Sequence, residues 1–262
     1  MKPPSSEVTW TVLGSSSGIP SPDRNCSGHL LEIGERLTLF DCGSGITSAF
    51  LKYGFDPDRL ENIFISHTHS DHISDLPLLV QLLYNLKRMN PLTIYLPAEA
   101  VAPIESLLQT CYLFREKFSF ELRIEPLQED RELSCGGFEV RAILNTHLLK
   151  SAPLISEHGY KNKMQCYSFL IKISNGKKIL YSADIGSLDD IIAFLEGLDL
   201  LILEGFHIDL AALYKYLSRN EVNRVILTHL PDGGRLSILK QISDSPYRNI
   251  LQTAEDGLSI IL

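Results

Sequence analysis

Six consecutive residues, His67-Thr68-His69-Ser70-Asp71-His72, place three imidazoles and a carboxylate in one short segment. The segment comes one residue after the apolar run Ile63-Phe64-Ile65, which is typical of a buried strand. Imidazole nitrogens and carboxylate oxygens are common ligands of zinc and similar divalent ions. A helix cap needs only one Ser or Asp, so capping alone does not explain three of the chain's eight histidines. The segment therefore predicts the core of a metal site.

Four later residues also follow strand-like runs directly or closely: His147, Asp184, Glu204 and His229. A sheet edge assembles a site from distant parts of a sequence in this way, because the side chains that follow its strands lie close together. We therefore expect one composite active site.

The order of these residues resembles the ligand series of the metallo-β-lactamase superfamily. The segments Leu13 to Pro20, Arg24-Asn25 and Leu39 to Gly45 are similar in particular to the ribonuclease Z-like branch and its phosphodiesterase relatives. The resemblance spans nearly the whole chain. It implies an α/β fold, a four-layer αββα sandwich, formed by a single domain over residues 1–262.

The resemblance also implies which residues bind metal. By position, one ion takes His67, His69 and His147, the second takes Asp71, His72 and His229, and Asp184 bridges both. We expect two divalent ions, zinc first, with manganese or iron as alternatives because N/O sites accept all three. A pair of such ions can deliver a metal-bound hydroxide to phosphorus or a carbonyl, with Asp71 positioning or deprotonating it.

Two further roles depend on the same resemblance. In the ribonuclease Z branch, a glutamate at the position of Glu204 supports a downstream histidine that protonates the leaving oxygen, but residues 209–224 contain no histidine. His207 is the substitute that we expect, and His158 is another candidate without positional support. Asp41 either orients a metal-binding histidine or is simply a turn residue, and we favour the first.

Short strand-like and helical segments alternate along the chain without a linker or repeat. Helices are expected near 46–53, 75–87, 103–113, 209–217 and 236–242, and loops at 128–132 and 150–163. Strands are expected near 8–13, 29–33, 36–40, 63–65, 92–96, 120–125, 138–145, 167–173, 178–181, 198–203, 224–227 and 258–262. The first three should form one antiparallel sheet, and Asn175-Gly176 indicates a hairpin.

Composition narrows the substrate and the compartment. The formal charge of -8 disfavours tight non-specific binding of nucleic acid, and the short turns at 174–176 and 187–189 leave no room for the basic arm of the tRNA-processing relatives. tRNA is therefore disfavoured as a substrate, although other nucleic acids stay open as partners.

No stretch approaches a membrane span of roughly 20 apolar residues, and residues 1–7 lack a secretory signal, so we expect a cytoplasmic protein. The five scattered cysteines suit reduced thiols that serve packing.

The leading interpretation is a dinuclear metal-dependent hydrolase, a phosphodiesterase acting on a small anionic phosphodiester or nucleotide. Three alternatives stay open: a thioester or lactone hydrolase of the glyoxalase-like type, an RNA-processing nuclease lacking the tRNA-binding arm, and a non-catalytic metal-stabilised binding protein. Relatives often pair as dimers, so a homodimer also stays open.

Overall fold

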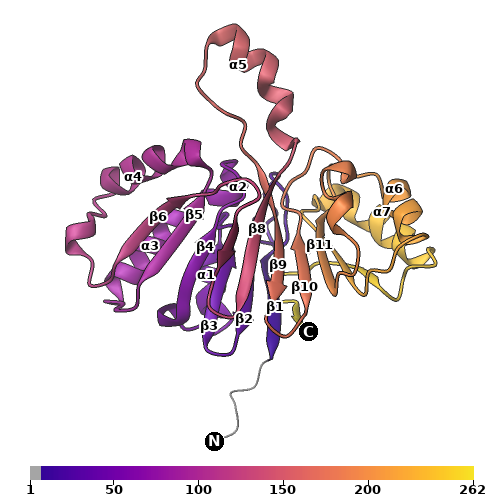
Figure 1. Ribbon diagram of the computed structural model, residues 1–262, viewed down its shortest axis with the longest axis horizontal. Coiled ribbons are helices and arrows are strands. Elements are labelled where there is room, and N and C mark those ends of the chain that lie inside the picture. The colour runs from indigo at the N-terminus through magenta and orange to yellow at the C-terminus, as the bar shows by residue number, and fades with distance from the viewer. Residues whose placement is uncertain (1–6) are drawn as a thin grey trace, which may run out of the picture. The chain divides into compact units, whose positions relative to one another are not determined.

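The computed structural model describes residues 7–262, which form two compact units (Figure 1). The first runs through Leu127 and includes Glu255–Leu262, and the second is Gln128–Ala254. Each unit contains one seven-stranded mixed sheet. Two large mixed sheets with helices confirm the expected α/β class, whereas the single domain over 1–262 stays a prediction. Residues 1–6, on which the expected lack of a secretory signal partly depends, lie outside the described part.

The sheet of the first unit has the strand order β14-β1-β2-β3-β4-β5-β6. The strands β1, β2 and β3 pair antiparallel as expected, and β14 adds to them antiparallel beside β1. The strands β3, β4, β5 and β6 pair parallel, so the expected antiparallel sheet is only part of a mixed one. The strands are β1 (Val8–Gly14), β2 (Gly28–Ile33), β3 (Arg36–Phe40), β4 (Leu60–Phe64), β5 (Leu92–Leu96), β6 (Leu122–Pro126) and β14 (Ser259–Ile261).

Helices of the first unit bury apolar residues against this sheet. Leu79 and Leu83 of one helix and Ile104 of another belong to the same core cluster as Leu39 and Ile63 of the central strands. Their spacing of three to four residues gives each helix one apolar side. The helices are α1 (Ile46–Lys52), α2 (Ser70–Ile73), α3 (Leu76–Asn85) and α4 (Val101–Thr110), with short 3₁₀ turns η1 (Pro57–Arg59), η2 (Ala98–Ala100) and η3 (Arg115–Lys117).

The sheet of the second unit has the order β13-β12-β11-β10-β9-β8-β7. Strands β8 and β9 are antiparallel, β9 and β10 are antiparallel, and β10, β11, β12 and β13 are parallel. It follows that β8, β10, β11 and β12 all run in the same direction. The strands are β7 (Glu132–Ser134), β8 (Phe138–Leu144), β9 (Tyr167–Ile173), β10 (Lys178–Tyr181), β11 (Leu200–Glu204), β12 (Val225–Thr228) and β13 (Leu251–Thr253).

Two helices cover one face of the second sheet. Leu213 and Leu217 of α6 and Ile242 of α7 pack in one cluster with Leu201 and Leu227 of the central strands. The helical elements are η4 (His147–Ser151), α5 (Ala152–His158), η5 (Leu188–Asp190), η6 (Ile192–Phe194), α6 (Leu210–Leu217) and α7 (Asp232–Ser243). Helix α7 begins four residues earlier than expected, because Gly233 and Gly234 lie inside its first turn.

The segment 150–163 is not the loop that the sequence predicted. It contains the end of η4 and the whole of α5, which stands apart from the sheet of its own unit (Figure 1). None of the residues of α5 is buried, so its sequence carries no apolar stripe to reveal a helix. Gly159, at a φ of 68°, ends the helix in the left-handed conformation that favours glycine.

Within residues 7–262, no helix is long and apolar enough to cross a membrane. Four of the five cysteines are buried, and Cys111 is exposed. Burial raises the pKa of the Cys42 thiol well above its usual value, which keeps it protonated. Buried neutral thiols fit the expected role in packing.

Arg88 ties together two turns of the first unit. The residue is only 3% exposed, and its guanidinium donates to the carbonyls of Pro57 and Leu60 on one side and to those of Asn90 (2.8 Å) and Pro91 (3.0 Å) on the other. The group therefore links the turn before β4 to the turn before β5.

Arg88→Met should lower the free energy of unfolding by about 2–4 kcal/mol, because it leaves buried carbonyls without donors. Urea denaturation measures the change. Arg123→Met is the matched control, since Arg123 forms an exposed ion pair with Glu121 on the surface of β6. That control should leave the unfolding midpoint almost unchanged. Equal midpoints for the two variants would contradict the role of Arg88.

Candidate metal centre

The predicted ligands of the first unit lie in the turn that follows β4. His67 and His72 are buried, Asp71 is half-buried and His69 is exposed. The rings of His67 and His69 lie 4.7 Å apart between centroids, and those of His67 and His72 lie 4.2 Å apart. His72 Nε2 lies 3.5 Å from Asp71 Oδ2. The turn therefore gathers imidazole and carboxylate donors, as the sequence predicted.

Asp41, at the end of the neighbouring strand β3, holds this turn in place. Its Oδ1 accepts from the backbone N–H of Ser66 (2.8 Å), and its Oδ2 accepts from Ser66 Oγ (2.9 Å). His72 Nδ1 lies 2.8 Å from Asp41 Oδ2 and donates to it when this nitrogen carries the proton. A carboxylate in that position fixes the tautomer and leaves Nε2 for a metal. The favoured interpretation of Asp41, as a residue that orients a metal-binding histidine, agrees with these contacts.

Asp41→Ala should weaken metal affinity by about 10- to 100-fold, the usual effect of losing a carboxylate that orients a metal-binding histidine. Competition with a chelator of known affinity measures this loss directly. The matched control is Asp58→Ala, at an exposed carboxylate of η1 in the same unit. Unchanged metal affinity in Asp41→Ala would contradict the orienting role.

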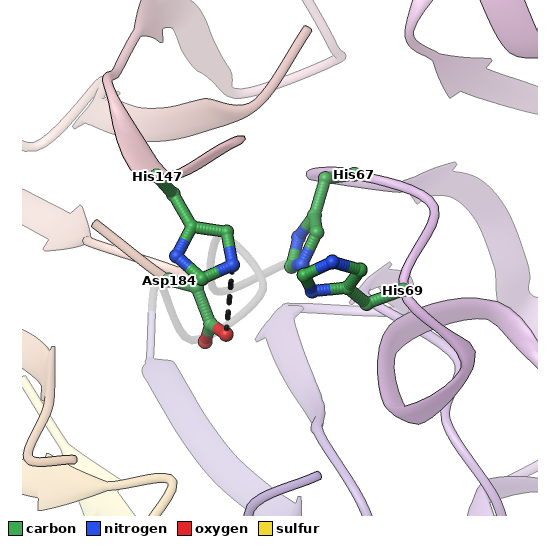
Figure 2. A group of neighbouring side chains, drawn as sticks. All are labelled: His67, His69, His147 and Asp184. Carbon is green, nitrogen blue, oxygen red and sulfur yellow. Dashed lines mark ion pairs between the residues drawn. The ribbon is translucent and has the colours of Figure 1, made fainter. Parts of the chain in front are cut away.

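The predicted residues of the second unit follow β8, β10, β11 and β12. Because these four strands run in the same direction, their carboxyl ends lie at one edge of the sheet. Asp184 Oδ2 lies 3.6 Å from His147 Nε2, and Asp184 Oδ1 lies 3.4 Å from His229 Nε2. Figure 2 draws His147 and Asp184 with their ion pair dashed, together with His67 and His69. Each carboxylate oxygen of Asp184 therefore faces a different imidazole.

Two polar side chains that the sequence analysis missed fix the loops that carry these ligands. Asn145 Oδ1 accepts from the backbone N–H of His147 (3.1 Å), and Asn145 Nδ2 donates to the backbone oxygen of Asp184 (3.0 Å). Asp190 Oδ2 accepts from the Gly186 N–H (2.9 Å) and from Thr146 Oγ1 (2.9 Å). The loop after β8 is thus bonded to the loop after β10 at two points.

Gly186 allows this close approach. A Cβ added there would lie 2.1 Å from Thr146 Oγ1, so no other residue fits without moving the loop. The residue type of Gly186 alone gave no signal, because glycine in a polar loop is common.

Three residues other than glycine adopt left-handed backbone conformations at or beside the candidate ligands. They are Asp41 (φ 60°), Ala183 (φ 48°) and His229 (φ 57°). Such conformations cost of order 1 kcal/mol each and persist only where surrounding contacts enforce them. At the end of a strand, a left-handed backbone conformation gives the side chain a different direction from the one that an extended backbone would give it.

Glu204 and His207 lie in one tight turn after β11. The buried Glu204 carboxylate accepts from the backbone N–H groups of Phe206 and His207 through Oε2, at 2.8 Å each. Its Oε1 lies 3.2 Å from His207 Nδ1, and the closeness of this carboxylate raises the pKa of His207 above its ordinary value. The His207 ring lies 5.0 Å from that of His147 and 6.1 Å from that of His229. His207 thus lies beside candidate metal ligands, with the Glu204 carboxylate next to its Nδ1.

The other histidine considered as a proton donor lies elsewhere in the same unit. His158 is the last residue of α5, exposed, with its ring 5.8 Å from that of Tyr160. It belongs to none of the groups of possible metal ligands found within the described residues. His207 is therefore the better candidate.

Comparison with known proteins agrees with the resemblance read from the sequence. A family model described as "Anti-Pycsar protein Apyc1" matches residues 8–234. Ribonuclease Z of Picrophilus torridus is 29% identical over 223 residues, which cover 73% of this chain and 71% of that protein.

Two solved structures share the fold over nearly the full length. The metallo-β-lactamase fold protein YhfI from Bacillus subtilis has a TM-score of 0.76 at 23% identity and covers 98% of this chain and 100% of its own. Unliganded yeast PDE1 has a TM-score of 0.71 at 15% identity and covers 98% of this chain and 99% of its own. The expected fold and the expected class of metal-dependent hydrolase are confirmed. The chain belongs to the family described as anti-Pycsar protein Apyc1, in the ribonuclease Z-like branch of the metallo-β-lactamase superfamily.

Proposed function

We propose that this hydrolase is a phosphodiesterase that acts on a small phosphodiester or nucleotide and holds two divalent ions through the predicted ligands. The observation that carries the proposal is the position of Asp184, whose two oxygens face His147 and His229 separately. A carboxylate that offers one oxygen to each of two ions is well suited to hold such a pair together.

The donor set fits this cofactor. The proposed ligands are His67, His69, Asp71, His72, His147, Asp184 and His229, all imidazoles or carboxylates. Such N/O donors suit zinc, manganese and iron, and catalytic zinc takes three protein ligands and keeps an open position. When bound, two such ions activate water and neutralise negative charge on the phosphoryl oxygens.

The chain's own residues supply orientation and proton transfer. Asp41 holds His72 through Nδ1, and Asn145 bonds to the backbone of both His147 and Asp184. Asp71 is half-buried, so its carboxylate can position or deprotonate the attacking water. His207, held by Glu204, donates the proton that the leaving oxygen needs.

Surface features support a small substrate. The turn from β9 to β10 spans only residues 174–177, and β10 is followed within a few residues by η5, so neither connection carries a long basic arm. The net charge of -8 disfavours extended polyanions. A nucleotide or another compact phosphodiester therefore fits better than tRNA.

Metal analysis of the purified protein, combined with a panel of substrates, tests the proposal. The panel contains a 3′,5′-cyclic nucleotide, a dinucleotide, an acyl-glutathione, a lactone and a single-stranded RNA. We expect bound metal, turnover of the small phosphodiesters, loss of turnover with a chelator and recovery on addition of zinc or manganese.

Other outcomes would replace the proposal with a specific alternative. Turnover of acyl-glutathione or lactone alone would identify an acyl hydrolase, and turnover of RNA alone would identify a nuclease. Metal-loaded protein that bound a nucleotide stoichiometrically and returned it intact would identify a binding protein.

A further inference from the structure

Phe206 is a large apolar side chain that is held beside the candidate site yet stays open to solvent. It is 48% exposed, although it lies between the buried Glu204 and the start of α6. Single exposed apolar residues are common and need no function by themselves. Three properties of the turn make Phe206 different from such a residue.

The first property is that the backbone of Phe206 is fixed on both sides. Gly205 N–H donates to the backbone oxygen of Thr228 (2.9 Å), and the N–H groups of Phe206 and His207 both donate to Glu204 Oε2 (2.8 Å each). A Cβ at Gly205 would lie 2.5 Å from Leu230 Cδ2, so the turn packs directly on the chain after β12. The exposed ring is thus presented from a rigid support, at a low cost in entropy when a ligand binds.

The second property is the neighbour of the ring. The Phe206 and His207 rings lie 4.8 Å apart at an interplanar angle of 71°, an edge contact between aromatic rings. His207 in turn lies 5.0 Å from His147. One imidazole therefore lies between Phe206 and a candidate metal ligand, and in a nucleotide the ribose likewise lies between the base and the phosphate.

The third property is the charge nearby. Lys150, three residues after His147 in η4, is exposed and is close enough to His207 to act on it electrostatically. A cation beside the candidate ligands suits the phosphate of a ligand, and an apolar ring next to it suits the ligand's uncharged part.

We propose that Phe206 is a specificity residue that stacks on the nucleobase of the substrate, so that the enzyme prefers nucleoside phosphodiesters to phosphodiesters without a base. This inference rests on the proposed function and narrows its substrate class. Stacking on a phenylalanine uses the face that every nucleobase has, so the preference extends to purines and pyrimidines. Phe206 takes no part in proton transfer or metal binding.

The test compares 3′,5′-cyclic AMP and 3′,5′-cyclic UMP with the 3′,5′-cyclic phosphate of methyl riboside, which has the same reacting group without a base. Base stacking is worth about 1–3 kcal/mol, so the metal-loaded wild-type chain should favour both nucleotides about 5- to 150-fold in kcat/KM, mainly through KM. In Phe206→Ala this ratio should fall close to one. Phe206→Tyr should keep the wild-type ratio, and Phe206→Leu should keep only a small part of the preference for the nucleotides.

The matched control is Tyr112→Ala, which removes an aromatic side chain that is 76% exposed in the first unit. It should retain the wild-type ratio. If Phe206→Ala retains the wild-type ratio, or Phe206→Leu restores it fully, stacking by Phe206 is wrong. Wild-type protein that hydrolyses all three esters equally would refute this inference alone, whereas metal-loaded protein that hydrolyses none of the phosphodiesters in either panel would refute the proposed function.

Discussion

Asp184→Asn should lower kcat for phosphodiesters by about 10³-fold or more, because metal ions contribute several kcal/mol of charge stabilisation and each 1.36 kcal/mol is a factor of ten. The substitution keeps the shape of the side chain and removes its charge. That charge lies 3.4 Å from His229 Nε2 and 3.6 Å from His147 Nε2. Without it, the carboxylate that faces both imidazoles no longer holds the proposed pair of cations.

Steady-state kinetics and metal content measured on the same samples check this prediction. The matched control is Asp199→Asn, a carboxylate of the same unit that accepts from Lys177 Nζ (2.9 Å) and from the backbone N–H of Lys178 (3.0 Å), just before β11. That variant should retain activity and metal. An Asp184→Asn protein with wild-type turnover would rule out Asp184 as a shared ligand.

His207→Gln should lower kcat by about 10²- to 10⁴-fold for substrates with an alkoxide leaving group, the usual contribution of a positioned general acid. The reason is the placement of His207, whose Nδ1 lies 3.2 Å from Glu204 Oε1 and whose ring lies beside that of the candidate metal ligand His147. A p-nitrophenolate leaves without protonation, so the loss with a p-nitrophenyl ester should be much smaller.

The comparison of leaving groups separates proton donation from other roles. Equal losses with both esters, or loss of bound metal, would indicate that His207 supports the metal site instead. His158→Gln is the matched control because His158 lies at the end of α5, outside the groups of possible ligands. It should leave both rates unchanged.

The strands were largely predictable, because their signals are local. The strand-like runs on either side of Asn175-Gly176 predicted the bounds of β9 and β10, and Gly34, at a φ of 56°, lies in the turn between β2 and β3. Strands β7 and β13 were missed because each has three residues of which only one is apolar, so neither shows an apolar run. The helix within the segment 150–163 was missed because none of the residues of α5 is buried.

The candidate ligands were predictable for a different reason. Histidines and an aspartate that follow apolar runs carry a chemical signal in their type and order, and the resemblance supplied the rest. Asn145 carried no such signal, because its partner at the backbone oxygen of Asp184 is 39 residues away and any polar loop residue looks the same in the sequence. The left-handed conformation of His229 was equally hidden, since only the packing of the fold enforces it.

The common direction of β8, β10, β11 and β12 has a consequence for how this protein can diversify. Hydrogen bonding between neighbouring strands fixes where each of these strands ends. The excursion over residues 150–163 belongs to no strand, so its length does not affect that pairing. Descendants can therefore lengthen, shorten or replace α5 while His147 and Asp184 keep their positions at the strand ends. The size of this excursion and the positions of the two side chains are thus independent of each other.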